Sequence, residues 1–277
     1  MIEGMTRAMT EALPESLHEA VLGVLHTADA DGKARAAAAA AKAWAAGRLE
    51  AEYRPGSMPS RPARPARPEL LSPAAMPRRT FKGERGRFAL LHSLAHIELN
   101  AIDLAFDLVG RFGHDMPRAF TDDWLKVGGE EAKHFLALQG RLAAMGGAYG
   151  DLPAHDGLWE AAEKTAHDLT ARLAVVPMVL EARGLDVTPK TVERLRGAGD
   201  TESAQVLEMI YEEEKGHVRA GTVWFTRLAA TKGAEPAALF HDMVRTYFKG
   251  ALKPPFNADA RHYAGLDAAF YEPLAGG

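Results

Sequence analysis

Hydrophobic and polar positions recur at helical spacing along most of the chain. Apolar residues return every three or four positions, which is typical of amphipathic helices. The pattern predicts long helices over residues 86–112, 117–145, 158–183 and 202–231, and a shorter one over 236–248. Alanine is abundant, and the alternating Val/Ile/Thr runs that mark strands are missing. The pattern therefore predicts an all-α fold.

Glycine and proline mark the expected ends of these helices. Residues 146–157 form a breaker-rich loop between the second and third long helices. We expect the stretch from Gly184 to Pro189 to interrupt the third helix, with Thr188 as an N-cap and Pro189 as the first residue of a short following helix.

The same pattern divides the chain into four parts. Residues 1–53 are expected to form an N-terminal helical extension, and the proline-rich residues 54–80 a linker or a strap. Residues 81–232 hold the long helices of a four-helix bundle, and residues 233–277 add a helix and an aromatic tail packed on it. The arginines of the proline-rich part could bind an anionic partner, but a solvated linker is the simpler interpretation.

Composition narrows the possible chemistry. The 277 residues are 47% hydrophobic, carry a net charge of −4 and include no cysteine. Thiolate metal sites and cysteine nucleophiles are thus excluded, so any metal must be held by His, Asp or Glu. No apolar run reaches the ~18–20 residues that span a bilayer, and the N-terminus lacks the apolar core of a signal peptide. We expect a cytoplasmic protein with no membrane or nucleic-acid partner.

Two Glu-x-x-His pairs indicate a metal site. Glu131 and His134 lie in the second long helix, and Glu214 and His217 in the fourth. At positions i and i+3 both side chains point to one helix face, as a di-metal carboxylate site requires. A single pair is weak evidence, and a third pair near the N-terminus is attributed to chance.

A repeat makes the two pairs more specific. Glu98 precedes Glu131 by 33 residues, and Glu181 precedes Glu214 by the same distance. The first hairpin's ligands map onto those of the second by a constant offset of 83 residues. The sequence therefore predicts six metal ligands on two helical hairpins: Glu98, Glu131, His134, Glu181, Glu214 and His217.

Other polar residues near these positions are assigned lesser roles. Tyr211 lies one turn before Glu214 and could support the site from behind the ligands, although a core tyrosine is the simpler interpretation. Glu130, Glu212 and Glu213 are rotated away from their ligand neighbours, so we expect them to be solvated or salt-bridged.

These motifs resemble the ferritin-like superfamily. The segments HSLAHIELNAIDLAFDL, DDWLKVGGEEAKHF and KPPFN are most similar to an uncharacterised bacterial ferritin-like family, a domain of unknown function. A more distant likeness is to the di-iron tRNA hydroxylases. The resemblance implies a ferritin-like four-helix bundle with metal ligands at the six positions.

Carboxylate and imidazole ligands suit iron, manganese or a mixed Mn/Fe pair. The leading hypothesis is a di-iron oxidoreductase, an oxidase or hydroxylase that uses dioxygen or peroxide on a small organic substrate, in a chain that could form a homodimer. One alternative is iron handling, as a ferroxidase or peroxide scavenger. Others are a non-enzymatic bundle with a structural metal site, and tRNA modification, supported only by the basic proline-rich segment.

Overall fold

Long helices make up most of the computed structural model, which describes residues 14–54, 56–77 and 83–276. No strand forms among these residues, where β-pairing is limited to isolated bridges. The all-α prediction is confirmed. In chain order the α-helices are α1 (Leu17–His26), α2 (Ala30–Ala45), α3 (Gly83–Phe112), α4 (Arg118–Ala144), α5 (Gly157–Lys164), α6 (Leu169–Val175), α7 (Ala182–Gly197), α8 (Thr201–Thr231), α9 (Pro236–Tyr247), α10 (Ala258–Tyr263) and α11 (Ala268–Tyr271). Shorter helical turns are η1 (Pro73–Ala75), η2 (Gly113–Asp115), η3 (Val176–Glu181) and η4 (Glu272–Leu274).

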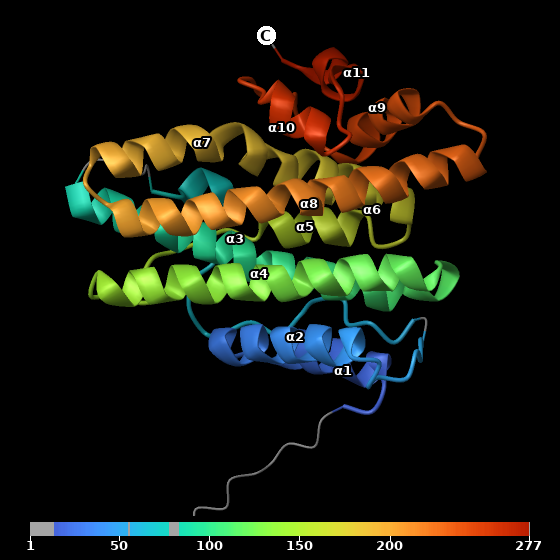
Figure 1. Ribbon diagram of the computed structural model, residues 1–277, viewed down its shortest axis with the longest axis horizontal. Helices are drawn as coiled ribbons and strands as arrows, with labels where there is room; N and C mark the ends of the chain where they lie inside the picture. Colours follow the sequence, from blue (N-terminus) through green and yellow to red (C-terminus); the bar gives the residue numbers. More distant parts are fainter. Residues whose placement is uncertain (1–13, 55, 78–82, 277) are drawn as a thin grey trace, which may run out of the picture.

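Four long helical segments run side by side through the centre of the molecule: α3, α4, the α6–η3–α7 segment and α8 (Figure 1). Helix α2 lies against α4, and α1 lies against α2 and α3, on the side away from α8. Helices α9 to α11 lie on the opposite side, against α6, α7 and α8. Each face of the central group is thus covered by an extension from a different end of the chain.

The first hairpin, α3–α4, is tightly packed and closely matches the predicted helices. Pro117 is the N-cap of α4, which fits a residue that cannot donate a backbone hydrogen bond. Gly128 of α4 faces Phe106 of α3, where an added Cβ would lie only 2.6 Å from the ring. A larger residue at Gly128 would push the two helices apart.

The third segment differs from its prediction. A turn separates α5 from α6, and the irregular stretch is a π-helical turn, η3, in which the amide of Ala182 bonds the carbonyl of Pro177. Gly184 and Pro189 do not interrupt the helix, because both lie inside the continuous α7. The predicted break at Gly184–Pro189 is therefore wrong, and the irregularity lies before Glu181 instead of after it.

A contact from the tail explains how Pro189 fits inside α7. Proline has no amide hydrogen, so the carbonyl four residues earlier, on Leu185, loses its usual helical partner. The side chain of Asn257 donates a hydrogen bond of 3.1 Å to that carbonyl. Because Asn257 precedes α10, the C-terminal tail supplies what the proline removes.

The proline-rich segment is a strap and not a solvated linker over its described residues. Its backbone bonds α1 through Ala63 and the loop before α5 through Leu71. Arg64 pairs with the buried Asp103 of α3, which also pairs with the buried Lys33 of α2. The predicted extension's first 13 residues and residues 78–82 lie outside the described part of the chain.

None of the helices within the described ranges is both long enough and apolar enough to span a membrane.

Candidate metal centre

Three of the central helices, α3, α4 and α8, bring side chains to one buried polar cluster. Glu98 comes from the middle of α3, Glu131 and His134 from α4, and Glu214 and His217 from α8. Four of these side chains, those of Glu98, Glu131, His134 and Glu214, place ligand atoms within 4.8 Å of one another and could hold a metal ion. Glu131 and His134 are fully buried. The i, i+3 spacing therefore does what the sequence predicts, because each pair faces the interior from its own helix.

The distances place Glu131 and Glu214 between the two imidazoles. Glu131 lies 3.4 Å from Nδ1 of His134 through Oε2 and 2.9 Å from Nδ1 of His217 through Oε1. Oε1 of Glu214 lies 3.9 Å from Nδ1 of His134 and 3.6 Å from Nδ1 of His217. Glu98 lies 3.3 Å from Nδ1 of His134. Both Nδ1 atoms thus point at shared carboxylates.

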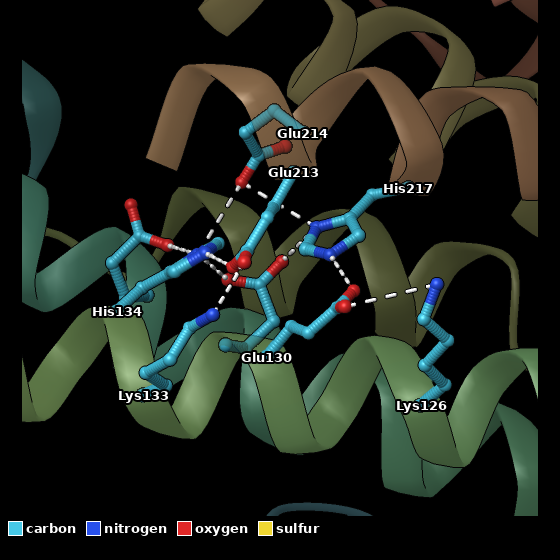
Figure 2. A network of polar contacts seen from close by, with 9 residues as sticks. Lys126, Glu130, Lys133, His134, Glu213, Glu214 and His217 are labelled. Carbon is cyan, nitrogen blue, oxygen red and sulfur yellow. Dashed lines mark hydrogen bonds and ion pairs between the residues drawn. The ribbon is translucent and has the colours of Figure 1, made fainter. Parts of the chain in front are cut away.

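The outer nitrogen of each histidine is held by a carboxylate from the other helix (Figure 2). Nε2 of His134 donates to Glu213 of α8 at 2.8 Å, and Nε2 of His217 donates to Glu130 of α4 at 3.0 Å. A carboxylate only accepts, so Nε2 of each ring carries a proton, and Nδ1 is the nitrogen left to bind a metal ion once its own proton is released. This is the arrangement of a metal-binding histidine, whose ring is oriented by a carboxylate behind it.

The fit of a cation can be tested on the inner atoms. Both oxygens of Glu131 and Nδ1 of His217 are buried, yet none makes a hydrogen bond with any described residue. Oε1 of Glu131 lies 2.9 Å from Nδ1 of His217 without the alignment of a hydrogen bond. Buried polar atoms are normally hydrogen-bonded. Buried polar atoms that converge without hydrogen bonds fit a shared cation.

Electrostatics favours positive charge in the cluster. Burial opposes charge on His134, but Glu131 and Glu98 outweigh it and raise the pKa of His134 to about 11. The pKa of His217 is also raised, because Glu131 and Glu214 outweigh its burial. Burial and the charge of Glu131 raise the pKa of the Glu98 carboxyl. Without a metal ion, the negative charge of the carboxylates thus favours the protonated form of both histidines.

Glu181 ends the π-helical turn beside this cluster. Its Oε2 is buried and makes no hydrogen bond with a described residue. Burial, then the charges of Glu214 and Glu131, raise the pKa of its carboxyl, while His217 acts in the opposite direction. The residue keeps some solvent-accessible surface and lies outside the tightest group of four. Of the two histidines, Glu181 interacts electrostatically with His217, whereas Glu98 lies next to His134.

The roles predicted for the neighbouring residues need correction. Glu130 and Glu213 do pair with Lys126 and Lys133, as expected of salt-bridged residues, but they also orient the histidines. That role was missed, although the two glutamates are themselves 83 residues apart and so continue the repeat.

Tyr211 forms no hydrogen bond with a cluster ligand in the described part of the chain. Its hydroxyl accepts a hydrogen bond from Asn257 of the tail, and Lys215 lies over its ring. Because the tail takes its one polar group, Tyr211 joins the tail to α8. The structure gives no support for a role behind the metal ligands.

Comparisons with known proteins match most of the chain, including the cluster. Residues 26–272 match a family described as "Protein of unknown function (DUF455)", and this range contains all six predicted ligands. A relative from Haemophilus influenzae (strain ATCC 51907 / DSM 11121 / KW20 / Rd), named "Uncharacterized protein", is 41% identical over 203 residues, which cover 71% of this chain and 70% of that protein. No solved structure matches the chain. The extent of the family match shows that the chain belongs to the DUF455 family.

Proposed function

We propose that this chain is a ferritin-like di-metal carboxylate protein and an oxygen-activating oxidase or hydroxylase of a small organic substrate. Iron is the first candidate for the pair of ions, with manganese or a mixed Mn/Fe pair as alternatives. The observation that carries the proposal is the convergence of buried polar atoms without hydrogen bonds from two hairpins of matching spacing. The proposed ligands are Glu98, Glu131, His134, Glu181, Glu214 and His217.

The contacts suggest how six residues would serve two ions. Glu98 is near His134, and Glu181 acts on the His217 side, so each glutamate–histidine pair would hold one ion. Glu131 and Glu214 lie between both rings and would be shared. A site of one Glu from each of two helices and a Glu-x-x-His pair from each of two others is the pattern of di-metal carboxylate bundles.

A redox-active pair of ions would supply electron transfer to dioxygen or peroxide when bound. The chain's own residues would do the rest. Glu130 and Glu213 would keep the proton on Nε2 and fix each ring, and the fully buried Glu131 and His134 would exclude water from the centre. The chain would thus orient the ligands and keep the centre dry.

The covered faces favour an enzyme over an iron-storage particle. A storage cage packs bundles through their outer faces. Here α1 and α2 cover the α4 face, and α9 to α11 cover the opposite one (Figure 1). Extensions of this kind are suited to building a substrate pocket or a lid.

Oxygen uptake by the reconstituted protein tests the proposal. Metal-free protein would be loaded with two equivalents of Fe²⁺ without air and then mixed with dissolved oxygen in an electrode cell. We expect rapid uptake that Glu131→Ala and His217→Ala abolish, while Glu212→Gln, an exposed carboxylate on the same helix, leaves it unchanged. Uptake that is equal in all four proteins would contradict the proposal. Continued oxidation of many iron equivalents into a particle would favour iron handling instead.

A further inference from the structure

An apolar pocket of about 390 Å³ lies between the C-terminal tail and the seam of α3 and η3. This volume is within the range of small-molecule sites, which are mostly apolar with a few polar groups. Its apolar walls come from α3, the start of α5, η3 and the tail: Ile97, Leu158, Val179, Leu180, Phe248 and Phe256. Ile97 is 42% exposed, which is unusual for an isoleucine on a helix of the core.

The pocket shares two walls with the candidate metal centre. Ile97 and Leu180 immediately precede Glu98 and Glu181 in the chain. Successive residues on a helix point about 100° apart, so the same turns can face the pocket on one side and the metal ligands on the other. The helical turns that carry Glu98 and Glu181 therefore also line the pocket.

The charges at the pocket are unbalanced. Arg261 is buried between aromatic rings and pairs with both oxygens of Asp186, at 2.8 and 2.7 Å, so these two groups neutralise each other. Arg183 bonds backbone carbonyls of the tail through one nitrogen, and Asp186 lies 3.4 Å from it. Lys253 is exposed and forms no ion pair with any described residue. Three cations against one carboxylate leave two positive charges at the rim.

We propose that this pocket binds an organic anion with an apolar body, an aliphatic carboxylate, and presents it to the metal centre. Its apolar walls would take the hydrocarbon part, while Arg183 and Lys253 would take the carboxylate. The binding site stands on the pocket itself, and only its link to the metal centre rests on the proposed function.

Isothermal titration calorimetry with three eight-carbon probes tests the binding. Octanoate, octan-1-ol and octylammonium share one apolar body and differ in charge. We expect octanoate to bind the full-length protein about tenfold more tightly than octanol, and octylammonium to bind most weakly. Equal affinity for octanoate and octanol would overturn the assignment of an anion, and no binding of octanoate would overturn the site.

Matched variants locate the binding. Lys253→Glu should weaken octanoate about tenfold and leave octanol unchanged, while Lys232→Glu, an exposed lysine at the end of α8, should change neither. Ile97→Glu should weaken both probes, and Val223→Glu, an equally exposed apolar residue of α8, should not. If Lys253→Glu and Ile97→Glu bind as the unmodified protein does, the ligand sits elsewhere and the proposal fails.

The visible spectrum of the Co²⁺-loaded protein separates this inference from the proposed function. We expect octanoate to change the cobalt bands in the unmodified protein and not in Ile97→Glu. Cobalt that loads without responding to bound octanoate would refute the link to the metal centre. Octanoate binding by a protein that takes up no cobalt would refute the proposed function and leave the pocket as a binding site.

Discussion

Glu130 and Glu213 each hold the outer nitrogen of a histidine from across the α4–α8 interface. We predict that Glu130→Gln or Glu213→Gln weakens metal binding by about 10- to 100-fold. The neutral amide holds the orientation of the histidine ring and the proton on its Nε2 less well than the carboxylate does. Competition with a chelator of known affinity measures this change.

Glu212→Gln is the matched control for that measurement. Glu212 precedes Glu213 on α8 but is exposed and pairs only with Lys215. Its variant should bind metal as the unmodified protein does. Metal affinity that is the same in the Glu130→Gln, Glu213→Gln and Glu212→Gln proteins would show that the outer carboxylates do not support the site.

Glu98 is expected to lower the stability of the metal-free protein. Burial and the charge of Glu131 raise the pKa of its carboxyl on folding, so its contribution to stability falls as the pH rises above the unfolded pKa. We predict that Glu98→Gln raises the free energy of unfolding of the metal-free protein at pH 7, because the amide carries no charge to bury. The same variant should lose most of the stabilisation that Fe²⁺ or Mn²⁺ gives the unmodified protein.

Urea unfolding with and without metal measures both effects of Glu98→Gln. Glu160→Gln on the exposed side of α5 provides the comparison, since it should alter neither value. A Glu98→Gln protein that is less stable without metal and gains as much from metal as the unmodified protein would argue that Glu98 is a structural residue.

At the level of single residues, spacing alone predicted which side chains meet. Glu98, Glu131, His134, Glu214 and His217 are brought together as the repeat indicates. The same repeat also contains the outer carboxylates, but helix geometry pointed them away from their neighbours on the same helix. They could not be placed from sequence because each serves the histidine of the opposite helix, and that pairing depends on how α4 and α8 pack.

The π-helical turn η3 is pressed against α8. An added Cβ on Gly221 would lie 2.5 Å from Cβ of Pro177. We predict that Gly221→Ala separates α8 from η3, lowers the free energy of unfolding by about 1–3 kcal/mol and weakens metal binding, since Glu181 ends that turn. Urea unfolding and chelator competition together report both changes.

Gly216→Ala on the same helix is the control, because nothing lies within 4 Å of the Cβ it would add. Replacing an open helical glycine by alanine should stabilise the protein by up to about 1 kcal/mol. Were Gly221→Ala also to stabilise the protein, the close contact between η3 and α8 would be disproved.

The strap is fixed to the bundle by a buried charge. Asp103 of α3 is fully buried and pairs with both Lys33 and Arg64. We predict that Arg64→Met lowers the free energy of unfolding by roughly 3 kcal/mol, because it leaves a buried carboxylate with one partner. Arg61→Met, at a strap residue whose side chain is 50% exposed, should change it by less than about 1 kcal/mol. If urea unfolding gives similar free energies for the Arg64→Met and Arg61→Met proteins, the ion pair of the strap adds little to stability.

Elements were predictable where the chain follows its local preferences. Helices α3, α4, α8 and α9 lie close to their predicted ranges, since each carries a long amphipathic pattern. The third segment was not predicted correctly, because Pro189 has the local sequence signal of a helix start. The hydrogen bond from Asn257 of the tail to the carbonyl of Leu185 replaces the one that the proline removes, and a contact over 72 residues leaves no local signal.

The whole molecule places its extensions on two sides of one polar core. On one side of the central helices α2 covers α4 and α1 packs on α2 and α3 (Figure 1). On the other side the tail forms part of the pocket beside α3 and η3. A core that buries several glutamates is costly to fold without a compensating cation. We interpret the close-packed coverings as the source of stability that lets the chain keep this cluster.

Anomalous diffraction at the iron edge, from crystals of the Fe²⁺-loaded protein, tests the central claim most directly. The account predicts two peaks between α3, α4, η3 and α8, one beside Glu98 and His134 and one beside Glu181 and His217, with Glu131 and Glu214 in reach of both. A single peak would contradict the paired site, and the absence of any peak from the cluster would contradict the metal centre itself.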